Sequence, residues 1–422
     1  MADRRLNSSM TSSDISLEAI DSVGQIPAAD WDACANPPIA HHRPAAPVDG
    51  APAHSISSSN ETYNPFVSHA FFTALEASHS ACARTGWKPR HLIARRDGAV
   101  VGIVPCYLKS HSQGEYVFDH GWADAYERAG GRYYPKLLAS VPFTPATGPR
   151  LLIRPGNDEA GVRAALARGL IGLCDATQAS SVHVTFAREE EWTFLAGNGF
   201  LQRTDQQFHW RNEGYSSFED FLASLNSRHR KAIRRERRDA LADGITIHVL
   251  TGSDLTEDAW DAFFRFYMET GSRKWGRPYL TRSFYSMIGA SMSRDIALIM
   301  ARREGRWIAG AINFIGSDTL FGRHWGAIEH HPFLHFEVCY YQAIEFAIRH
   351  RLKTVEAGAQ GEHKIARGYL PQTTYSAHYI ADPALRRAVG DYLKRERQYV
   401  AEAGRELTEA GPFRKAGDDG VS

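Results

Sequence analysis

A short segment in the last quarter of the chain, EAGAQGEHKIARGYLP (356–371), places acidic, basic and imidazole side chains among glycines. Acyl transfer to an amine needs a base that takes a proton from the amine and a cation or amide that holds the oxyanion. Glu356, Glu362 and His363 could each act as the base; Glu362 and His363 are preferred, and the choice between these two remains open. Lys364 and Arg367 are three positions apart, so on a helix they share a face and can stabilise negative charge. The segment therefore predicts a catalytic centre, with a charged turn at a strand end as the alternative.

Other chemistries fit this segment poorly. A phosphate-binding P-loop requires Ser or Thr after the Gly-Lys step, whereas here Gly361 is followed by Glu-His-Lys. No G-x-G-x-x-G follows a predicted strand, and no G-x-S-x-G is present for a hydrolase. A metal site is not predicted either, because Pro332 interrupts the helix face that His331 and His335 would share.

A strongly basic segment lies in the middle of the chain. From 228 to 238 it contains seven Lys or Arg residues and a single acid, Glu236. As a helix it would be anchored by Leu225, Ala232 and Ile233, and its cations would face outward. It is either a solvated helix or a surface that binds phosphate of a nucleotide, tRNA or another anionic ligand. The candidate phosphate ligands are Arg228, Arg230, Lys231, Arg234 and Arg235.

The elements around these segments repeat. An apolar hairpin pattern at 91–109 turns at Asp97-Gly98, and a second one at 297–316 turns at Glu304-Gly305. Each follows a helical pattern, and each half ends in a Gly-aromatic-Leu step before an alternating strand. We interpret this as two copies of one α/β unit with a seam near 212–214. The predicted organisation is an N-terminal segment with a Pro/Ala/Ser-rich flexible insertion (1–62), a first unit (63–213), a second unit carrying the basic helix and the candidate site (214–412), and a tail (413–422).

Bulk composition limits the functional classes. With 422 residues and a net charge of +1, the chain is long enough for two domains and has no global attraction to DNA or anionic membranes. Its five cysteines are scattered without a C-x-x-C pair, which disfavours disulfides and structural zinc and favours a reducing compartment. No run of eighteen apolar residues and no secretory signal pattern is seen, so we expect a cytoplasmic protein without a membrane span.

Four longer segments resemble a known bacterial family. They are KSHSQGEYVFDHGWADAYERAGGRYYPKLLASVPFTPATGPRLL, GRHWG, LHFEVCYYQAIE and EAGAQGEHKIARGYLP. Together they are similar to the FemAB-like proteins labelled peptidoglycan biosynthesis/recognition, within the GNAT acyltransferase superfamily. The resemblance covers about 66–413 and leaves the insertion at 35–61 outside. It implies a mixed α/β fold of two tandem GNAT-like domains, each a mixed sheet flanked by helices.

The resemblance also implies an activity. Fem proteins transfer an amino acid from aminoacyl-tRNA to the peptide of a peptidoglycan precursor, and a Lys before a Gly-aromatic step is thought to assist. In this sequence that residue is Lys364, before Gly368-Tyr369, and the Fem basic helical segment matches 228–238. The long helical arm of many Fem proteins has no counterpart here. Neither half contains the R/Q-x-x-G-x-G/A pyrophosphate loop, which disfavours acetyl-CoA.

We therefore expect an N-acyltransferase that acts on an amine acceptor without a tightly bound cofactor or metal, using aminoacyl-tRNA or an acyl-CoA as donor. The alternatives are a non-catalytic module that recognises a cell-wall fragment or nucleotide, and an acyl-CoA-dependent N-acetyltransferase. Substrate is expected between the long polar-aromatic loop of the first half and the candidate centre of the second. The candidate substrate ligands are Glu115, Asp119, Trp122, Tyr134, Lys136, Arg323, His324, Trp325, Glu337, Glu356 and Tyr369.

Overall fold

The computed structural model describes residues 15–37, 63–156, 158–274, 278–358 and 361–414. Side chains at 272–274 and at Glu362 lie outside that description. The predicted flexible insertion and the end of the tail also fall outside it.

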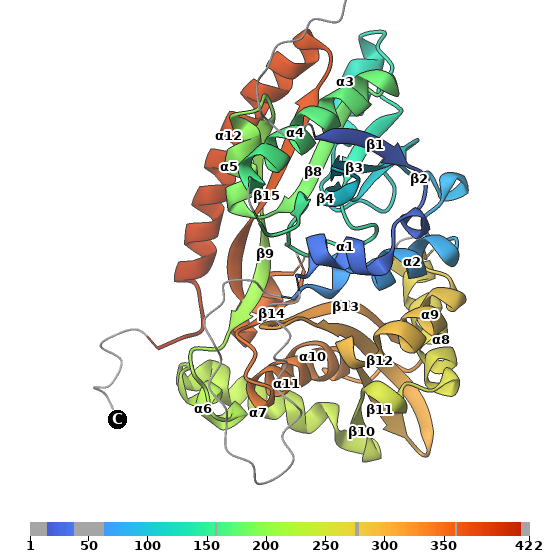
Figure 1. Cartoon of the computed structure of the whole chain (residues 1–422). Helices are drawn as coiled ribbons and strands as arrows, with labels where there is room; N and C mark the ends of the chain where they lie inside the picture. Colours follow the sequence, from blue (N-terminus) through green and yellow to red (C-terminus); the bar gives the residue numbers. More distant parts are fainter. Residues whose placement is uncertain (1–14, 38–62, 157, 275–277, 359–360, 415–422) are drawn as a thin grey trace, which may run out of the picture.

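Up to the seam the chain contains both strands and helices (Figure 1). The elements are β1 (Ser16–Ile20), α1 (Ala28–Ala35), α2 (His69–Ala77), β2 (Trp87–Pro89), β3 (His91–Arg96), β4 (Ala99–Val104), β5 (Cys106–Lys109), α3 (His120–Arg128), β6 (Lys136–Ala139), β7 (Leu152–Ile153), α4 (Glu159–Ala176), β8 (Ser181–Ala187), α5 (Glu189–Ala196) and β9 (Leu201–Arg211). Short 3₁₀ turns η1 (Val23–Gln25), η3 (Pro65–Val67) and η4 (Ala83–Thr85) connect them.

The second half has a similar order. Its elements are α6 (Phe218–Ala223), α7 (Ser227–Ala240), η5 (Ala242–Gly244), β10 (Thr246–Leu250), η6 (Gly252–Asp254), α8 (Glu257–Lys274), α9 (Arg282–Met292), η7 (Ser293–Asp295), β11 (Ile296–Arg303), β12 (Arg306–Ile315), β13 (Thr319–Ala327), α10 (Leu334–Phe336), the π-helical η8 (Glu337–Tyr341), α11 (Gln342–Arg349), β14 (Thr354–Glu356), η9 (Glu362–Arg367), β15 (Leu370–Ile380) and α12 (Pro383–Glu409). In both halves a strand and two helices precede a hairpin, and a helix then leads to a parallel strand, a short helix and a last strand. The mixed α/β fold, with a similar order of elements in its two halves, is thus as predicted.

The two hairpins form at the predicted turns. Asp97 and Gly98 between β3 and β4 have φ of 51° and 82°, and Glu304 and Gly305 between β11 and β12 have φ of 49° and 76°. Two consecutive residues with positive φ match the right-handed twist of the paired strands, and glycine accommodates the second position without strain. These local signals could therefore be recognised without tertiary information.

The two halves exchange their last strands. The strands form a four-stranded sheet, β1-β3-β4-β7, and an eleven-stranded sheet, β10-β11-β12-β13-β14-β9-β15-β8-β6-β5-β2. In the larger sheet β9 pairs with β14 and β15 of the second half, while β15 pairs with β8 of the first half. Figure 1 shows these strands crossing the middle of the molecule. The sheet is therefore continuous across the seam.

Each half also contains a fork, which we define as the point where its parallel strand pair stops pairing. In the second-half fork, β13 and β14 pair up to Phe321 and Glu356, and β13 then continues paired only with β12. In the first-half fork, β6 and β8 pair up to Ala139 and Val184, and β8 then continues paired only with β15. Just past a fork, the edge of the continuing strand that faced the parallel partner is free of the ladder, so it can face a ligand.

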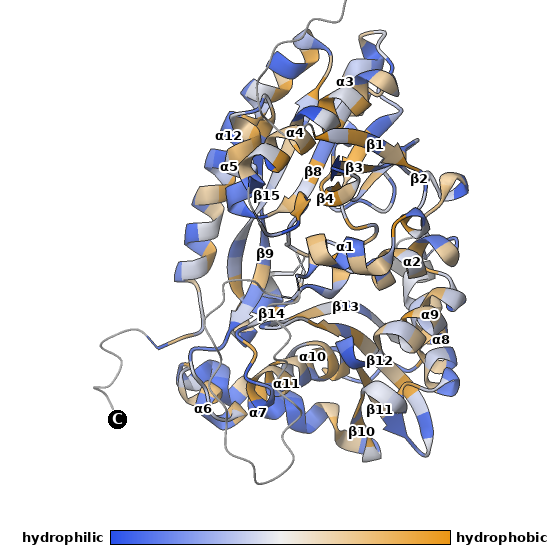
Figure 2. Ribbon diagram, viewed as in Figure 1, coloured by the Kyte–Doolittle hydropathy of each residue, from blue (hydrophilic) through white to orange (hydrophobic). Residues whose placement is uncertain are grey.

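A shared apolar core joins the halves. Phe66 from η3 and Phe71 from α2 pack on Phe314 of β12, with ring centroids 4.9 and 5.6 Å away, and Phe71 also contacts Phe284 of α9 at 5.8 Å. All four rings are buried. No helix in the described part of the chain has a stretch long and apolar enough to cross a membrane. Figure 2 shows that hydrophilic residues instead dominate α7, the predicted basic helix.

Candidate functional site

The carboxyl group of Glu356 lies at the second-half fork, as the last residue of β14. The residue is only 8% exposed. Burial raises the pKa of Glu356 to about 8, although Arg323, the Thr147 backbone amide and Arg150 each oppose the increase. A carboxyl group with a pKa near neutrality can accept and release a proton under ordinary conditions. Glu356, predicted as a substrate ligand, therefore has the electrostatics of a proton acceptor.

Strand β9 of the first half supplies neighbours that sequence reasoning did not identify. His209 is opposite Glu356 in the β9–β14 ladder, and its Nε2 lies 3.9 Å from Glu356 Oε1. Burial lowers the pKa of His209 to about 3. Between pH 3 and pH 8 both groups are therefore uncharged, so this contact is not an ion pair. Gln207, two residues earlier, donates from Nε2 to the Pro145 carbonyl at 2.5 Å and ties β9 to a first-half loop.

Arg323 brings positive charge to the same fork from β13. Its guanidinium donates from Nη2 to the Phe143 carbonyl at 3.1 Å, across the boundary between the halves. Burial lowers the pKa of Arg323, while Tyr116 and Glu356 oppose the decrease. Arg323 thus stands between a first-half loop and the carboxyl group of Glu356.

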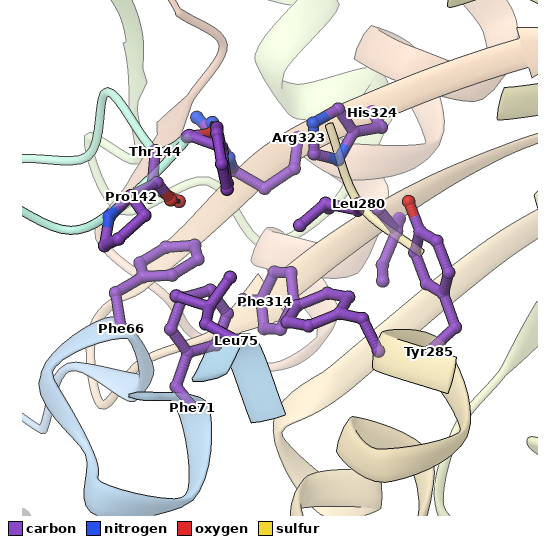
Figure 3. A pocket seen from close by; sticks show the side chains of 13 residues that line it. Phe66, Phe71, Leu75, Pro142, Thr144, Leu280, Tyr285, Phe314, Arg323 and His324 are labelled. Carbon is purple, nitrogen blue, oxygen red and sulfur yellow. Dashed lines mark hydrogen bonds between the residues drawn. The ribbon is translucent and has the colours of Figure 1, made fainter. Parts of the chain in front are cut away.

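A pocket between the halves lies beside Arg323; we call it the inter-half pocket. Figure 3 shows Arg323 and His324 at one end and Phe66 and Phe71 at the other. The Tyr285 hydroxyl points toward the first of these ends, and within the described residues it is buried without a hydrogen-bond partner. Burial lowers the pKa of His324 to about 3, so its ring is neutral. The pocket therefore has an apolar end and a polar end, toward which the unpartnered Tyr285 hydroxyl points.

The loop that closes this pocket is held by an inward-facing arginine. Arg150 is buried and donates to the carbonyls of Thr185 at 2.8 Å, Pro149 at 3.0 Å and Ala146 at 2.6 Å. Its backbone N–H donates to the Glu191 carboxylate at 2.9 Å. Because these bonds fix the loop, its carbonyls and amides reach Arg323 and Glu356 in a defined position.

Lys364 lies on η9, and its side chain reaches the residues that directly follow β14. Its Nζ donates to the carbonyls of Ala357 at 2.5 Å and Gly358 at 3.2 Å. Burial lowers the pKa of Lys364 to about 8. An ammonium group has three protons, so one N–H remains after these two bonds. Lys364 therefore holds the two residues that follow Glu356.

The other predicted catalytic residues have different surroundings. Arg367 donates from Nη2 to both carboxylate oxygens of Glu236 at 2.8 Å, which binds η9 to α7. Its guanidinium carbon is 3.5 Å from the centre of the Phe336 ring. His363 is exposed, and its Nε2 is 3.1 Å from the Tyr340 hydroxyl. Arg367 is thus committed to α7, and His363 is more open to solvent than Glu356.

The predicted basic helix forms as α7, and part of it faces solvent. Arg228, Lys231, Arg234 and Arg235 are exposed, whereas Arg230 is half-buried. Arg234 pairs with Glu219, Arg235 with Asp239, and Arg230 donates to the Leu225 carbonyl. Arg228 and Lys231 make no hydrogen bond or ion pair to another described residue. An anionic ligand can therefore reach these two cations of α7 without displacing a partner in the described part of the chain.

The substrate ligands predicted in the first half form a buried charge cluster. Lys136 donates from Nζ to Ser112 at 2.7 Å, Glu115 at 2.8 Å and Asp119 at 2.5 Å. The Tyr134 hydroxyl is 2.9 Å from Ser112 Oγ. Burial by itself would raise the pKa of Asp119, but the neighbouring Lys136 ammonium outweighs this effect and the pKa is lowered. These groups mostly bind one another.

The remaining predicted residues are spread around the second half and α3. Trp122 on α3 stacks on His183, with centroids 6.2 Å apart. Trp325 packs against His335 at 5.3 Å. Glu337 is buried and accepts from Arg237 at 2.9 Å.

Tyr369 is also buried, and its hydroxyl donates to the Tyr340 carbonyl at 3.2 Å. The structure therefore brings Glu356 together with Arg323 and leaves Trp122 and Glu337 in separate clusters. Among the residues that the structure describes, no group of three or more His, Cys, Asp or Glu side chains is arranged to hold a metal ion.

Comparisons with known proteins give a family match and several distant structural neighbours. The model of a FemAB-like family, described as peptidoglycan biosynthesis/recognition, matches residues 22–415. No curated protein sequence matches the chain. The crystal structure of FemX is 13% identical over 73% of this chain and 92% of its own, with a TM-score of 0.47. L-PGS from Bacillus licheniformis is 9% identical over 80% of this chain and 99% of its own, with a TM-score of 0.47. A tandem GNAT protein from the clavulanic acid biosynthesis pathway is 13% identical over 88% and 99%, with a TM-score of 0.43.

Proposed function

The chain belongs to the FemAB-like family of peptidoglycan biosynthesis/recognition, and we propose that it transfers an acyl or aminoacyl group to an amine acceptor at the second-half fork. The observation that carries this proposal is the buried carboxyl group of Glu356, whose pKa burial raises to about 8. It lies where β13 and β14 stop pairing, so a substrate can approach it without breaking the sheet.

Glu356 serves as the general base. An acceptor ammonium group gives a proton to the Glu356 carboxylate, and the neutral amine nitrogen then attacks the carbonyl carbon of the donor. The new C–N bond forms a tetrahedral oxyanion, which collapses as the donor's C–O or C–S bond breaks. The leaving group takes up the proton that Glu356 accepted, and the regenerated carboxylate then takes the second proton from the new amide nitrogen and releases it to solvent. We prefer Glu356 to His363, which is exposed and contacts Tyr340.

Two cations support the reaction at this fork. Arg323 provides positive charge next to Glu356 and at the polar end of the inter-half pocket, where it can stabilise an oxyanion. Lys364 positions Ala357 and Gly358, and its remaining N–H is available to the same oxyanion. Arg367 acts as a positioning residue, because it connects η9 to Glu236 on α7.

The donor carries phosphate and approaches along α7. Arg228 and Lys231 are exposed on that helix and are free to bind it. Because Arg367 connects α7 with η9, a donor bound on the helix would lie near the segment that contains Lys364. An aminoacyl-tRNA or an acyl-CoA both meet this requirement, and a peptidoglycan precursor with a free amine is the proposed acceptor.

The test is a product assay with matched donors. Purified protein is incubated with a UDP-linked muropeptide and either charged tRNA or an acyl-CoA, and products are identified by mass spectrometry. We expect a product whose mass exceeds that of the acceptor by one acyl or aminoacyl group, and we expect Glu356→Gln to abolish it. Thermal stabilisation by these ligands without any product would instead indicate a non-catalytic binding module.

A further inference from the structure

A second pocket lies at the first-half fork, apart from the inter-half pocket; we call it the first-half pocket. Its walls include Ser140, just past β6, and Thr185, near the end of β8. The pocket is also lined by Thr144, Trp87 and Glu115. The space is narrow, so it fits one small polar group at a time.

Glu115 lines this pocket, and one of its two carboxylate oxygens lacks a hydrogen-bond donor. Its side chain is 4% exposed, and Oε2 accepts from Lys136 at 2.8 Å. Oε1 is buried and accepts no hydrogen bond from any described residue. Lys109 Nζ is 3.8 Å away from Oε1, beyond hydrogen-bond distance, and donates to the Gln113 carbonyl at 3.1 Å. A buried carboxylate oxygen without a donor is unfavourable, and native structures seldom leave one unpaired.

The neighbouring cations do not satisfy this oxygen. Lys136 already donates to Ser112, Glu115 and Asp119, which uses all three of its protons. Burial lowers the pKa of Lys109 to about 7, so near neutral pH part of its population is uncharged. Burial also raises the pKa of Glu115, although Lys136 and Lys109 oppose the increase, so these two cations do not fully compensate the Glu115 carboxylate. A donor that also carries positive charge would complete the cluster.

The pocket wall offers further acceptors. Ser140 Oγ donates to the Val141 carbonyl at 3.3 Å, and Thr144 Oγ1 donates to the Pro142 carbonyl at 2.9 Å. Each hydroxyl donates a hydrogen bond to a carbonyl, so the lone pairs of its oxygen remain free to accept hydrogen bonds. Together with Glu115, these oxygens give the pocket several hydrogen-bond acceptors, which suits a primary ammonium group with its three N–H donors.

We infer that the first-half pocket binds a primary ammonium group, which donates a hydrogen bond to Glu115 Oε1. The inference does not depend on the acyl transfer proposed above, since it concerns a different pocket and can be tested by binding. Thr144 lines both pockets, so the first-half pocket adjoins the pocket that contains Arg323.

The experiment compares two cations of equal charge. Ethylammonium chloride has N–H donors and tetramethylammonium chloride has none, so the two salts are added at equal ionic strength and Tm is measured by calorimetry. We expect ethylammonium to raise the Tm of the wild-type protein by about 1 °C or more over tetramethylammonium. Glu356→Gln should keep this difference, and Glu115→Gln should lose it.

Three results would overturn the inference. The first is an equal Tm shift from both salts, which would mean that the pocket holds water only. The second is loss of the Tm difference in Glu356→Gln. The third is an unchanged Tm difference in Glu115→Gln. If Glu115→Gln does not fold, Thr185→Leu fills the pocket and leaves the Glu115–Lys136 pair in place. That variant should also lose the difference, and retention of the difference would contradict the inference.

Discussion

Glu356 Oε1 lies 3.9 Å from His209 Nε2, although the two residues come from opposite halves of the chain. The contact exists because β9 is inserted beside β14. His209 is neutral above pH 3, so it does not supply a charge that would lower the pKa of Glu356. The exchanged strand thus helps to bury the proposed base without neutralising it.

Glu356→Gln should reduce kcat/KM by about 10²-fold or more, the scale of losing a general base. In the wild-type protein kcat/KM should rise with pH and level off above about 8, because the carboxylate is the active form. The measurement is a pH–rate profile with one acceptor. Glu345→Gln, which changes a carboxylate that pairs with Arg237 instead, is the control and should behave like the wild-type protein. A profile without a step near pH 8 would contradict the assignment.

The same substitution should stabilise the protein in alkaline solution. A carboxyl group with a pKa of 4.5 when unfolded and about 8 when folded releases a proton on unfolding between these pH values. Its contribution to the stability of the folded state is therefore complete below pH 4.5 and is lost as pH rises to about 8. Glu356→Gln should raise the free energy of unfolding at pH 8 by a few kcal/mol, since each pH unit between the two pKa values corresponds to about 1.4 kcal/mol, and should have little effect at pH 4. Denaturant unfolding at the two pH values measures this, and equal effects at both would rule it out.

Lys364→Met should lower kcat by about 10²-fold, the scale of losing an oxyanion donor, with a smaller change in KM. It also removes the bonds to Ala357 and Gly358, so Tm should fall while the circular dichroism spectrum stays native. Lys353→Met is the matched control, because that lysine is 75% exposed and directly precedes β14, the strand that Ala357 and Gly358 follow. Wild-type turnover in Lys364→Met would remove Lys364 from the proposed mechanism.

Reversing the charge of Arg228 and Lys231 to Glu should raise the KM for a phosphate-bearing donor by about 10-fold at low salt. The dependence of KM on salt should weaken as well, since fewer phosphate contacts release fewer counterions. Lys394→Glu with Arg395→Glu on α12 makes the same change in net charge elsewhere and should leave KM unchanged. Identical salt dependence in both double variants would argue against α7 as the donor surface.

If the chain is cut at 212–214 and both halves are produced together, the two halves should remain associated. Each half contributes its last strand to the other half's sheet, so residues 1–213 alone would lack the β15 partner of β8. We expect the first half alone to aggregate or unfold non-cooperatively, whereas the co-produced halves should elute together in size-exclusion chromatography. A monomeric first half with cooperative unfolding would show that the exchange is dispensable.

Much of the local structure could be predicted from the sequence. Asp97-Gly98 and Glu304-Gly305 specify tight turns by their backbone preferences, and the apolar runs beside them specify paired strands. The segment that begins at the last residue of β14 is recognisable as a candidate site because it concentrates acidic and basic side chains among glycines. The helical basic segment is predictable from Ile233 and its polar neighbours, although Ala232, expected on the anchoring side, is exposed.

The sequence by itself therefore determined the hairpins, the tandem order of elements and the chemical content of the segment at 356–371, because these depend on neighbours in the chain. Only the tertiary structure decided which strand lies beside β14, since β9 and β15 follow similar patterns and either could pair with its own half. That pairing buries Glu356 and places His209 next to it. It is also tertiary packing that couples Lys136 to Glu115 and Asp119, and Arg367 to Glu236. Burial and pairing of charges are properties of the assembled fold, and they determine which of the candidate groups is able to accept a proton.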